Sequence, residues 1–293
     1  MTNTVAKLSK SVREYKRDAI FTPILVVAEV AMDVVIPMLI SHLIDFGITP
    51  GDMDYIYKVG FQLVFACLAA LALGVLSGRF AAKASAGFAK NLRKDMYYNV
   101  QNFAFSNIDK FSTPSIITRM TTDVTNVQMS FQMMIRVAVR APIMLVSALF
   151  MAFRLGGKLA MVYLIVIPVL GFGLYFSAIS VAKIFKRAFK RYDALNAAVQ
   201  ENVSGIRVVK SYVREDYEIE KFNAMSNEMR QDFTQAENRL ALNMPMMQLC
   251  IYGTMTAIFW FGSRFIMNGS MTTGNLMSLV TYTMQMLNSM MMR

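Results

Sequence analysis

The sequence is poor in charge, in histidine and in cysteine, and each shortage excludes a class of protein. Only 17% of its 293 residues are Asp, Glu, Lys or Arg, whereas a typical soluble domain carries about 25%. Its single histidine, His42, cannot build a metal site alone, and Cys67 and Cys250 lie in apolar segments without partners at metal-ligand spacing. We therefore expect neither a soluble domain nor a bound metal, and interpret both cysteines as small packing residues.

The chain is instead rich in apolar sequence: 55% of its residues are hydrophobic and its mean hydropathy is +0.41. A helix needs ~20 mostly apolar residues to span a bilayer. Six segments approach that length, and no alternating pattern typical of β-strands competes with them. They predict an all-α polytopic membrane protein with six transmembrane helices, at about 19–46, 57–78, 137–153, 159–182, 241–263 and 274–292.

Two hydrophilic stretches of 57 residues each, 79–135 and 183–239, separate these segments. Apolar residues recur in both at steps of three and four, which is typical of the seams of helix bundles. Gly205 marks a place where a helix can end in the second stretch, and Pro114 interrupts the pattern in the first. We expect two long helical hairpins that extend the transmembrane helices, with arms of about 22 residues, or ~33 Å.

Lysine and arginine are unevenly distributed along the chain. Residues 1–18 hold 5, residues 79–140 hold 9 and residues 183–239 hold 11, which makes 25, against four in the remaining loops. The positive-inside rule then places the N-terminus and both hairpins in the cytoplasm. We expect a multi-pass protein of the plasma membrane, and we expect its source to be a bacterium. Topology explains the net charge of +11, so membrane lipid is the expected partner and nucleic acid is not.

Residues 1–18 combine five basic residues with a few apolar ones. A cleavable signal peptide does not fit, because a long span follows instead of a short apolar core. We expect a basic interfacial N-terminal helix, with a disordered basic tail as the alternative. At the lower end of the third span, Arg136 and Arg140 are expected to extend their side chains to the interface.

Three sequence runs are more specific than this architecture. QENVSGIRVVKSYVREDYEIEKF closely resembles the second intracellular loop of ATP-binding-cassette (ABC) exporters, and FSNIDKFSTPSIITRMTTDVTNVQ resembles the first. EVAMDVVIPMLISHLIDFGI is similar to the first span of the multidrug-type branch. The resemblance covers nearly the whole chain, with one departure at Pro114, where the family often has glycine. It implies the type-1 (type IV) exporter fold.

The resemblance also implies a dimer of half-transporters, either homodimer or heterodimer, whose twelve spans open alternately to each side under the drive of nucleotide-binding domains. In that family the hairpin tips are coupling helices seated in grooves of those domains. The corresponding tips here are about 106–115 and 205–214. The candidate coupling residues are Asn107, Ile108, Asp109, Lys110, Phe111, Gly205, Ile206, Arg207, Val209, Lys210, Tyr212, Val213 and Arg214.

A phosphate-binding loop of the form G-x-x-x-x-G-K-[ST] is missing. The run Gly156-Gly157-Lys158 lacks the earlier glycine and is followed by Leu159. We therefore do not expect this chain alone to hydrolyse ATP or to bind a cofactor; ATP and Mg²⁺ are implied for a nucleotide-binding domain that the chain does not contain. We interpret residues 19–293 as the transmembrane domain of a longer transporter, truncated here, or alternatively as a separate permease subunit.

Glu29 and Asp33 lie one helical turn apart in the first span, where unpaired carboxylates are costly. They can form a cation-attracting patch on the transport path, or a polar clamp to Arg, Ser or Asn on a neighbouring helix, and the sequence leaves both readings open. Tyr282, Gln285 and Asn288 recur at helical spacing on the last span and are predicted to line the substrate pathway with them.

The function predicted from these features is that of the membrane-spanning part of an ATP-driven exporter. Its expected substrates are amphipathic or drug-like small molecules, cations or lipids among them. Two alternatives remain: a proton-coupled secondary carrier that uses Glu29 and Asp33, and a membrane scaffold that docks a cytoplasmic partner through the hairpin tips. The two long hairpins argue against the carrier, since carriers need no such stalks.

Overall fold

The computed structural model describes residues 8–103 and 113–291, and every regular element within these ranges is helical. The all-α prediction is therefore confirmed. In chain order the elements are η1 (Lys10–Tyr15), α2 (Lys16–His42), η2 (Leu43–Ile48), α3 (Met53–Gln101), α5 (Thr113–Thr118), η3 (Arg119–Asp123), α6 (Val124–Gly156), η4 (Gly157–Ala160), α7 (Met161–Ser204), α8 (Ile206–Ser211), α9 (Glu215–Ala241), α10 (Asn243–Met267) and α11 (Thr273–Met291).

Four segments are long and apolar enough to cross a membrane: Lys10–Ile48, Met53–Gln101, Thr113–Ser204 and Glu215–Met267. The third contains both the third and the fourth expected span, on either side of Gly157. The sixth expected span, α11, is not among the four, because polar residues such as Asn275, Gln285 and Asn288 lower its hydropathy. A multi-pass membrane protein is thus supported, while the number of six spans stays a prediction.

Several helices are much longer than a bilayer requires. α3 has 49 residues and α7 has 44, which correspond to about 73 Å and 66 Å at the ~1.5 Å rise per residue of an α-helix. The hydrocarbon core of a bilayer is only ~30 Å thick. Each helix therefore continues without a break from an apolar segment into a hydrophilic one.

Residues 1–161 and 255–293 form one compact unit. In it α2 packs along α3, and α6 contacts α2, α3 and α11. The buried side chains of this unit include large ones on α11, such as Tyr282 and Met286, and small ones on α3 and α6, where Ala81, Ala84 and Ala148 let the helices approach closely.

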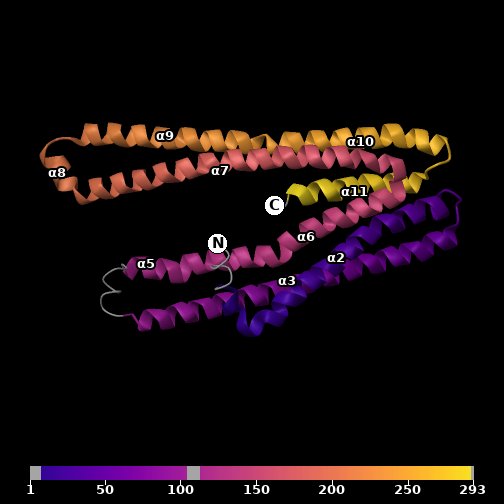
Figure 1. Cartoon of the computed structure of the whole chain (residues 1–293), viewed down its shortest axis with the longest axis horizontal. Helices are drawn as coiled ribbons and strands as arrows, with labels where there is room; N and C mark the ends of the chain where they lie inside the picture. The colour runs from indigo at the N-terminus through magenta and orange to yellow at the C-terminus, as the bar shows by residue number, and fades with distance from the viewer. Residues whose placement is uncertain (1–7, 104–112, 292–293) are drawn as a thin grey trace. The chain divides into compact units, whose positions relative to one another are not determined.

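The first hydrophilic stretch pairs the end of α3 with the elements that return after residue 112 (Figure 1). Phe88 and Phe131 stack across the two arms with ring centroids 4.8 Å apart. The π-helix η3 loosens the returning arm, and Arg93 of α3 donates to the carbonyl oxygen of Met120 there over 3.3 Å. These contacts hold the two arms of this stretch together.

The N-terminal segment is a short 3-10 helix, η1, that docks on the same part of α3. The Asn91 amide donates to the carbonyl of Ser11 over 3.1 Å, and Asp95 accepts from the Ser11 hydroxyl and pairs with Arg13 over 2.7 Å. Gly87 gives room to the ring of Tyr15, which any Cβ at this position would overlap. The position of η1 at a membrane interface stays a prediction.

Residues 162–254 form the second compact unit. Here α7 and α9 run side by side and are joined at one end by α8, so the stretch 183–239 is a helical hairpin (Figure 1). Phe185 and Phe189 of α7 pack with Phe233 of α9, and the ring centroids of Phe185 and Phe233 are 6.0 Å apart. Near α8, the Asn202 amide of α7 donates to the carboxylate of Glu218 of α9 over 3.0 Å.

Candidate functional site

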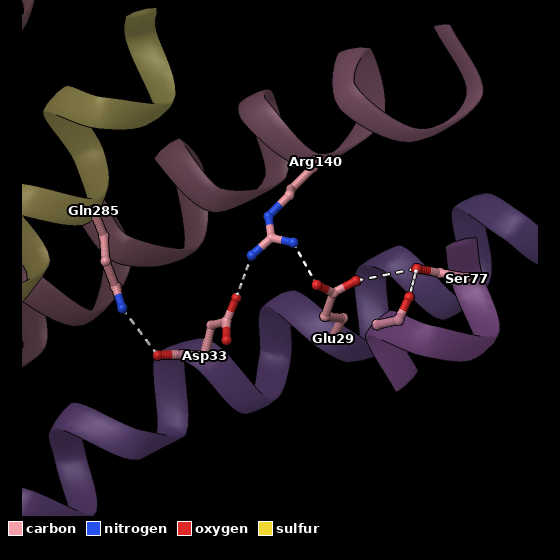
Figure 2. A network of polar contacts seen from close by, with 6 residues as sticks. Glu29, Asp33, Ser77, Arg140 and Gln285 are labelled. Carbon is pink, nitrogen blue, oxygen red and sulfur yellow. Dashed lines mark hydrogen bonds and ion pairs between the residues drawn. The ribbon is translucent and has the colours of Figure 1, made fainter. Parts of the chain in front are cut away.

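Two sets of predicted residues form defined structures, and the first is a charged cluster between α2, α3 and α6. Arg140 of α6 reaches between the two carboxylates of α2 (Figure 2). One of its terminal nitrogens binds Asp33 Oδ2 over 2.7 Å and the other binds Glu29 Oε1. The hydroxyl of Ser77, on α3, donates to Glu29 Oε2 over 3.2 Å. We call Glu29, Asp33, Arg140 and Ser77 the carboxylate cluster.

The carboxylate cluster is mostly withdrawn from solvent, with 10% of the Glu29 side chain and 23% of the Asp33 side chain exposed. Gly74 makes room for it: a Cβ at this position would lie 3.3 Å from Glu29 Oε1, closer than such atoms normally approach. With all three groups ionised, two carboxylates face one guanidinium, so the cluster carries one net negative charge. It can therefore hold α2 against α6 and still attract a cation.

The position of Arg140 corrects one expectation from the sequence. Its guanidinium does not extend to an interface but binds two carboxylates that precede it by 111 and 107 residues. The arrangement has the contacts of a polar clamp between helices, which was one of the two readings of Glu29 and Asp33. A sequence signal for it existed, since an arginine and two carboxylates stand in otherwise apolar runs and such groups pair in membranes.

The pathway residues predicted on α11 differ in their surroundings. The Tyr282 hydroxyl is buried and donates to the carbonyl of Val34 over 2.7 Å, and the Gln285 amide donates to the carbonyl of Asp33 over 3.1 Å (Figure 2). The Ser278 hydroxyl, on the same side of α11, donates to the carbonyl of Pro37 over 2.5 Å. Asn288 is exposed. Tyr282 and Gln285 thus tie α11 to α2, and their place on a substrate path stays a prediction.

The second defined structure is the end of the hairpin in residues 162–254. α7 ends at Ser204, Gly205 separates it from the six-residue helix α8, and Arg214 precedes α9. Gly205 interrupts the helix as the sequence predicted, although with a negative φ of −92° and not in the left-handed region. We call Gly205–Arg214 the hairpin tip.

The hairpin tip exposes apolar side chains far from any apolar segment. Tyr212 is 76% exposed and Val213 80%, and Ile206 and Val208 are also exposed. Val213 has a φ of +50°, which is strained for a β-branched residue. Val209, predicted to share this exposed face, is only half exposed and instead lines a groove.

That groove has a volume of about 400 Å³ and lies between α7, α8 and α9. Its apolar wall includes Val199, Val203, Ile219 and Phe222. At its rim, Lys210 pairs with Glu215 over 2.9 Å, and this hydrogen-bonded lysine lowers the pKa of the Glu215 carboxyl. The tip therefore combines an apolar surface with a charged rim, as protein-binding surfaces do.

Other predicted coupling residues surround this surface. Arg207 is exposed and its carbonyl accepts from the Ser211 hydroxyl over 2.7 Å, while Arg214 stacks over the ring of Tyr217 with 6.0 Å to its centroid. The predicted residues of the first tip, Asn107 to Phe111, lie outside the described residues. Within residues 8–103 and 113–291, no three His, Cys, Asp or Glu side chains are grouped so that they could hold a metal ion.

Comparison with known proteins identifies the family. The model of the ABC transporter transmembrane region matches residues 19–290, nearly the whole chain. The chain belongs to this family. The resemblance expected from the loop sequences is confirmed, and the long continuous helices and the hairpins can be described as parts of an ABC transporter transmembrane region.

Three similar proteins come from bacteria. YfiB of Bacillus subtilis, named an uncharacterized ABC transporter ATP-binding protein, is 29% identical over 88% of this chain and 45% of its own length. A relative with the same description in Mycobacterium tuberculosis is 28% identical over 98% of this chain and 50% of its own. A Rickettsia prowazekii relative named "Putative export ATP-binding/permease protein" is 25% identical over 94% and 48%. This transmembrane region thus spans about half the length of the relatives it matches.

Proposed function

We propose that this chain is the membrane-spanning part of an ATP-driven exporter that moves amphipathic or drug-like compounds out of the cytoplasm by alternating access. The observation that carries the proposal is the hairpin tip, where Tyr212 and Val213 are 76% and 80% exposed although they lie in a hydrophilic stretch. Apolar groups this exposed call for a partner that buries them. A nucleotide-binding domain is such a partner, and the names of the relatives, which combine ATP-binding and permease, support it.

The helix lengths support a mechanical role for the tip. α7 continues for 44 residues from an apolar segment to Ser204, next to the tip. An unbroken ladder of backbone hydrogen bonds from Pro168 to Ser204 lets this part of α7 move largely as one piece, whereas Pro168 permits a bend within the apolar part. Movement of a domain bound at the tip would therefore displace the transmembrane end of α7. Movement of the transmembrane end would in turn displace the domain bound at the tip. The proposal has two further parts. The tip of the first hairpin binds a nucleotide-binding domain as well, and a second half-transporter, identical or different, forms the other half of the dimer.

The carboxylate cluster is the proposed contact for substrate. Its net negative charge favours cationic amphipathic compounds over anionic ones, while Arg140 keeps the charge from being prohibitive within the membrane. Transport driven by a pH gradient without ATP would instead support the secondary carrier that the same carboxylates allow.

The substitution Tyr212→Ala in the full transporter tests the coupling. Truncating an aromatic anchor at a small contact costs about 2 kcal/mol or more of binding, so stimulation of ATP hydrolysis by substrate, and transport, should be lost. Basal hydrolysis should persist, because the catalytic groups lie elsewhere. ATPase activity is measured against substrate concentration in proteoliposomes, together with uptake into inside-out vesicles.

The control is Tyr192→Ala. Tyr192 is also an exposed tyrosine, but it lies on α7, away from the tip. The substitution should leave stimulation and transport near their wild-type values. Normal stimulation in Tyr212→Ala would show that this tip is not the coupling element, and equal loss in both variants would point to a general weakening of the hairpin.

A further inference from the structure

The hairpin of α7 and α9 contains one buried charge that the proposed mechanism does not use. Asp232 of α9 has a side chain only 2% exposed, although it stands in a hydrophilic stretch of sequence. Two arginines of α7 bind it, one at each oxygen. Arg187 contacts Oδ1 over 2.5 and 2.8 Å, and Arg191 contacts Oδ2 over 2.8 Å. We call Asp232, Arg187 and Arg191 the aspartate lock.

Neighbouring groups complete the hydrogen bonding of the aspartate lock. Arg187 also donates to the side chain of Gln235 over 3.1 Å, and Arg191 to the carbonyl of Glu228 over 3.2 Å. The Glu228 carboxylate lies 3.5 Å from Arg191, so two carboxylates balance two guanidinium groups. A fully satisfied and neutral network of this kind is tolerated inside a protein, whereas a partial one is not.

The aspartate lock lies at the root of the hairpin, where the arms leave their apolar segments. Beside it, Ala188 of α7 and Ala236 of α9 are fully buried, and the rings of Phe185 and Phe233 meet. Toward the tip the contact between the arms opens into the apolar groove. The lock is therefore the most specific connection between the arms on the membrane side of that groove.

Apolar stripes hold two helices together but define their axial position poorly, because dispersion and apolar burial are not directional. A slip by one turn shifts a helix by ~5.4 Å and brings similar side chains into contact. A buried ion pair contributes little net stability, but a polar group in an apolar seam can fix the register of two helices. Only at the observed register do two guanidinium groups meet Asp232, because a slip of one turn exchanges one of them for Lys183 in one direction or for Leu195 in the other.

We propose that Asp232 is a positioning residue that fixes the register of α7 against α9 and so sets where the hairpin tip stands relative to the root of the hairpin. When the register is fixed, α7 and α9 move together. When it is not, a displacement of the hairpin tip makes α7 slide along α9 and does not reach the root of the hairpin. The consequence for coupling rests on the proposed function, whereas the consequence for register does not.

The register is tested by pulsed electron paramagnetic resonance on the full transporter in nanodiscs. Spin labels replace the exposed Gln200 and Ala224 after Cys67 and Cys250 have been changed to alanine, and labelled protein is diluted with unlabelled protein so that distances within one chain dominate. The unmodified lock should give one narrow distance. Asp232→Leu should give a broad or split distribution, because a slip of one turn moves the two labels past each other by ~5.4 Å along the helix axis.

Asp232→Leu is chosen because leucine fills the seam, and Arg187 and Arg191, whose side chains are 52% and 37% exposed, can turn to water once the carboxylate is gone. A thermal midpoint near that of the parent then shows that the protein is folded. Arg187→Gln combined with Arg191→Gln should broaden the distance in the same way. The control Asp193→Asn changes an exposed aspartate of α7 and should leave the distance narrow. A single narrow distance in both lock variants overturns the proposal.

Transport measurements separate the two claims. Asp232→Leu should lower substrate-stimulated transport by about tenfold, a typical coupling factor, with basal ATP hydrolysis retained. Transport at the wild-type rate despite a broadened distance overturns the positioning role and leaves the exporter proposal standing. If the parent protein shows no ATP-driven transport at all, the exporter proposal fails, while the distance measurement still decides whether Asp232 fixes the register.

Discussion

Arg140 serves two carboxylates at once, so its removal affects more than one contact. Without it, Glu29 and Asp33 would stand one turn apart in a mostly buried place, with the Ser77 hydroxyl as the remaining side-chain donor to Glu29. Each would lose its ion pair and be repelled by the other. Breaking a buried ion pair from one side costs about 3–5 kcal/mol, and the partial exposure of Arg140 moves the expected cost toward the lower end.

The substitution Arg140→Gln should therefore reduce the free energy of unfolding by about 3 kcal/mol. A triple variant that also carries Glu29→Gln and Asp33→Asn should recover much of this loss, because no uncompensated charge remains. The measurement is denaturant unfolding in mixed micelles. Arg136→Gln, one turn earlier on α6, is the matched control and should have a small effect. Equal losses at positions 136 and 140 would contradict the ion-pair network.

The same carboxylates separate a structural clamp from a substrate contact. Glu29→Gln with Asp33→Asn should weaken transport of cationic compounds and spare neutral ones if the cluster attracts substrate. A loss of folded protein in the membrane would favour the clamp alone.

For single residues, the sequence predicts part of the carboxylate cluster. The two carboxylates stand out because a charge in an apolar run is costly and demands a reason. Arg140 stands out for the same reason, but its pairing with them is not predicted, since it joins residues more than 100 positions apart and depends on how α2 packs against α6. Asp232 carries no signal at all, because an aspartate in a hydrophilic stretch looks like an ordinary solvated charge.

At the scale of the helices, α2 and α11 are joined by a hydrogen bond whose acceptor is freed by a proline. Pro37 has no N–H, so the carbonyl of Asp33, four residues earlier, lacks its helical donor. The Gln285 amide of α11 donates to this carbonyl in its place. Polar side chains of neighbouring helices are known to satisfy backbone groups that proline frees within a membrane. Pro37 thus supplies the acceptor that Gln285 recognises.

The substitution Gln285→Leu should destabilise the protein by about 1 kcal/mol, the typical worth of such a hydrogen bond. In the background Pro37→Ala the same change should cost less, because the alanine N–H now satisfies the Asp33 carbonyl. Unfolding free energies of the four proteins of this cycle give the coupling. The exposed Asn288 provides the control substitution, Asn288→Leu. Equal costs of Gln285→Leu in both backgrounds would show that the two positions are independent.

The sequence predicts the helices better than their connections. Apart from Leu242, the described residues of all six expected apolar segments are helical, and Gly205 interrupts the second hydrophilic stretch where expected, because apolar periodicity and glycine are local signals. The π-helices η2 and η3 were not foreseen. No local pattern marks them in the sequence, and in η3 the Met120 carbonyl accepts from Arg93 of α3, a residue 27 positions earlier in the chain.

For the whole molecule, charge and hydropathy together predict a topology that the fold makes easy to test. The hairpin tip and the loop before α3 belong to opposite sides in this prediction, since 25 basic residues gather on the side of the hairpins and four on the other. Translocating a basic segment of this density across the membrane is unfavourable. The predicted orientation therefore rests on sequence composition and not on how the helices pack.

Single cysteines in a background without Cys67 and Cys250 should reveal this orientation. Asp54 and Asn268, both exposed, should react in intact cells with a membrane-impermeant maleimide, whereas Ser211 and Asp193 should react only after the membrane is opened. Asp54 is preferred to Asp52, because the Asp52 carboxylate caps α3 by accepting from the N–H of Tyr55 over 3.1 Å. A permeant maleimide provides the control that all four positions are accessible. Labelling of Ser211 from outside would invert the topology, and an inverted tip could not meet cytoplasmic ATP-binding domains, so the exporter proposal would fall with it.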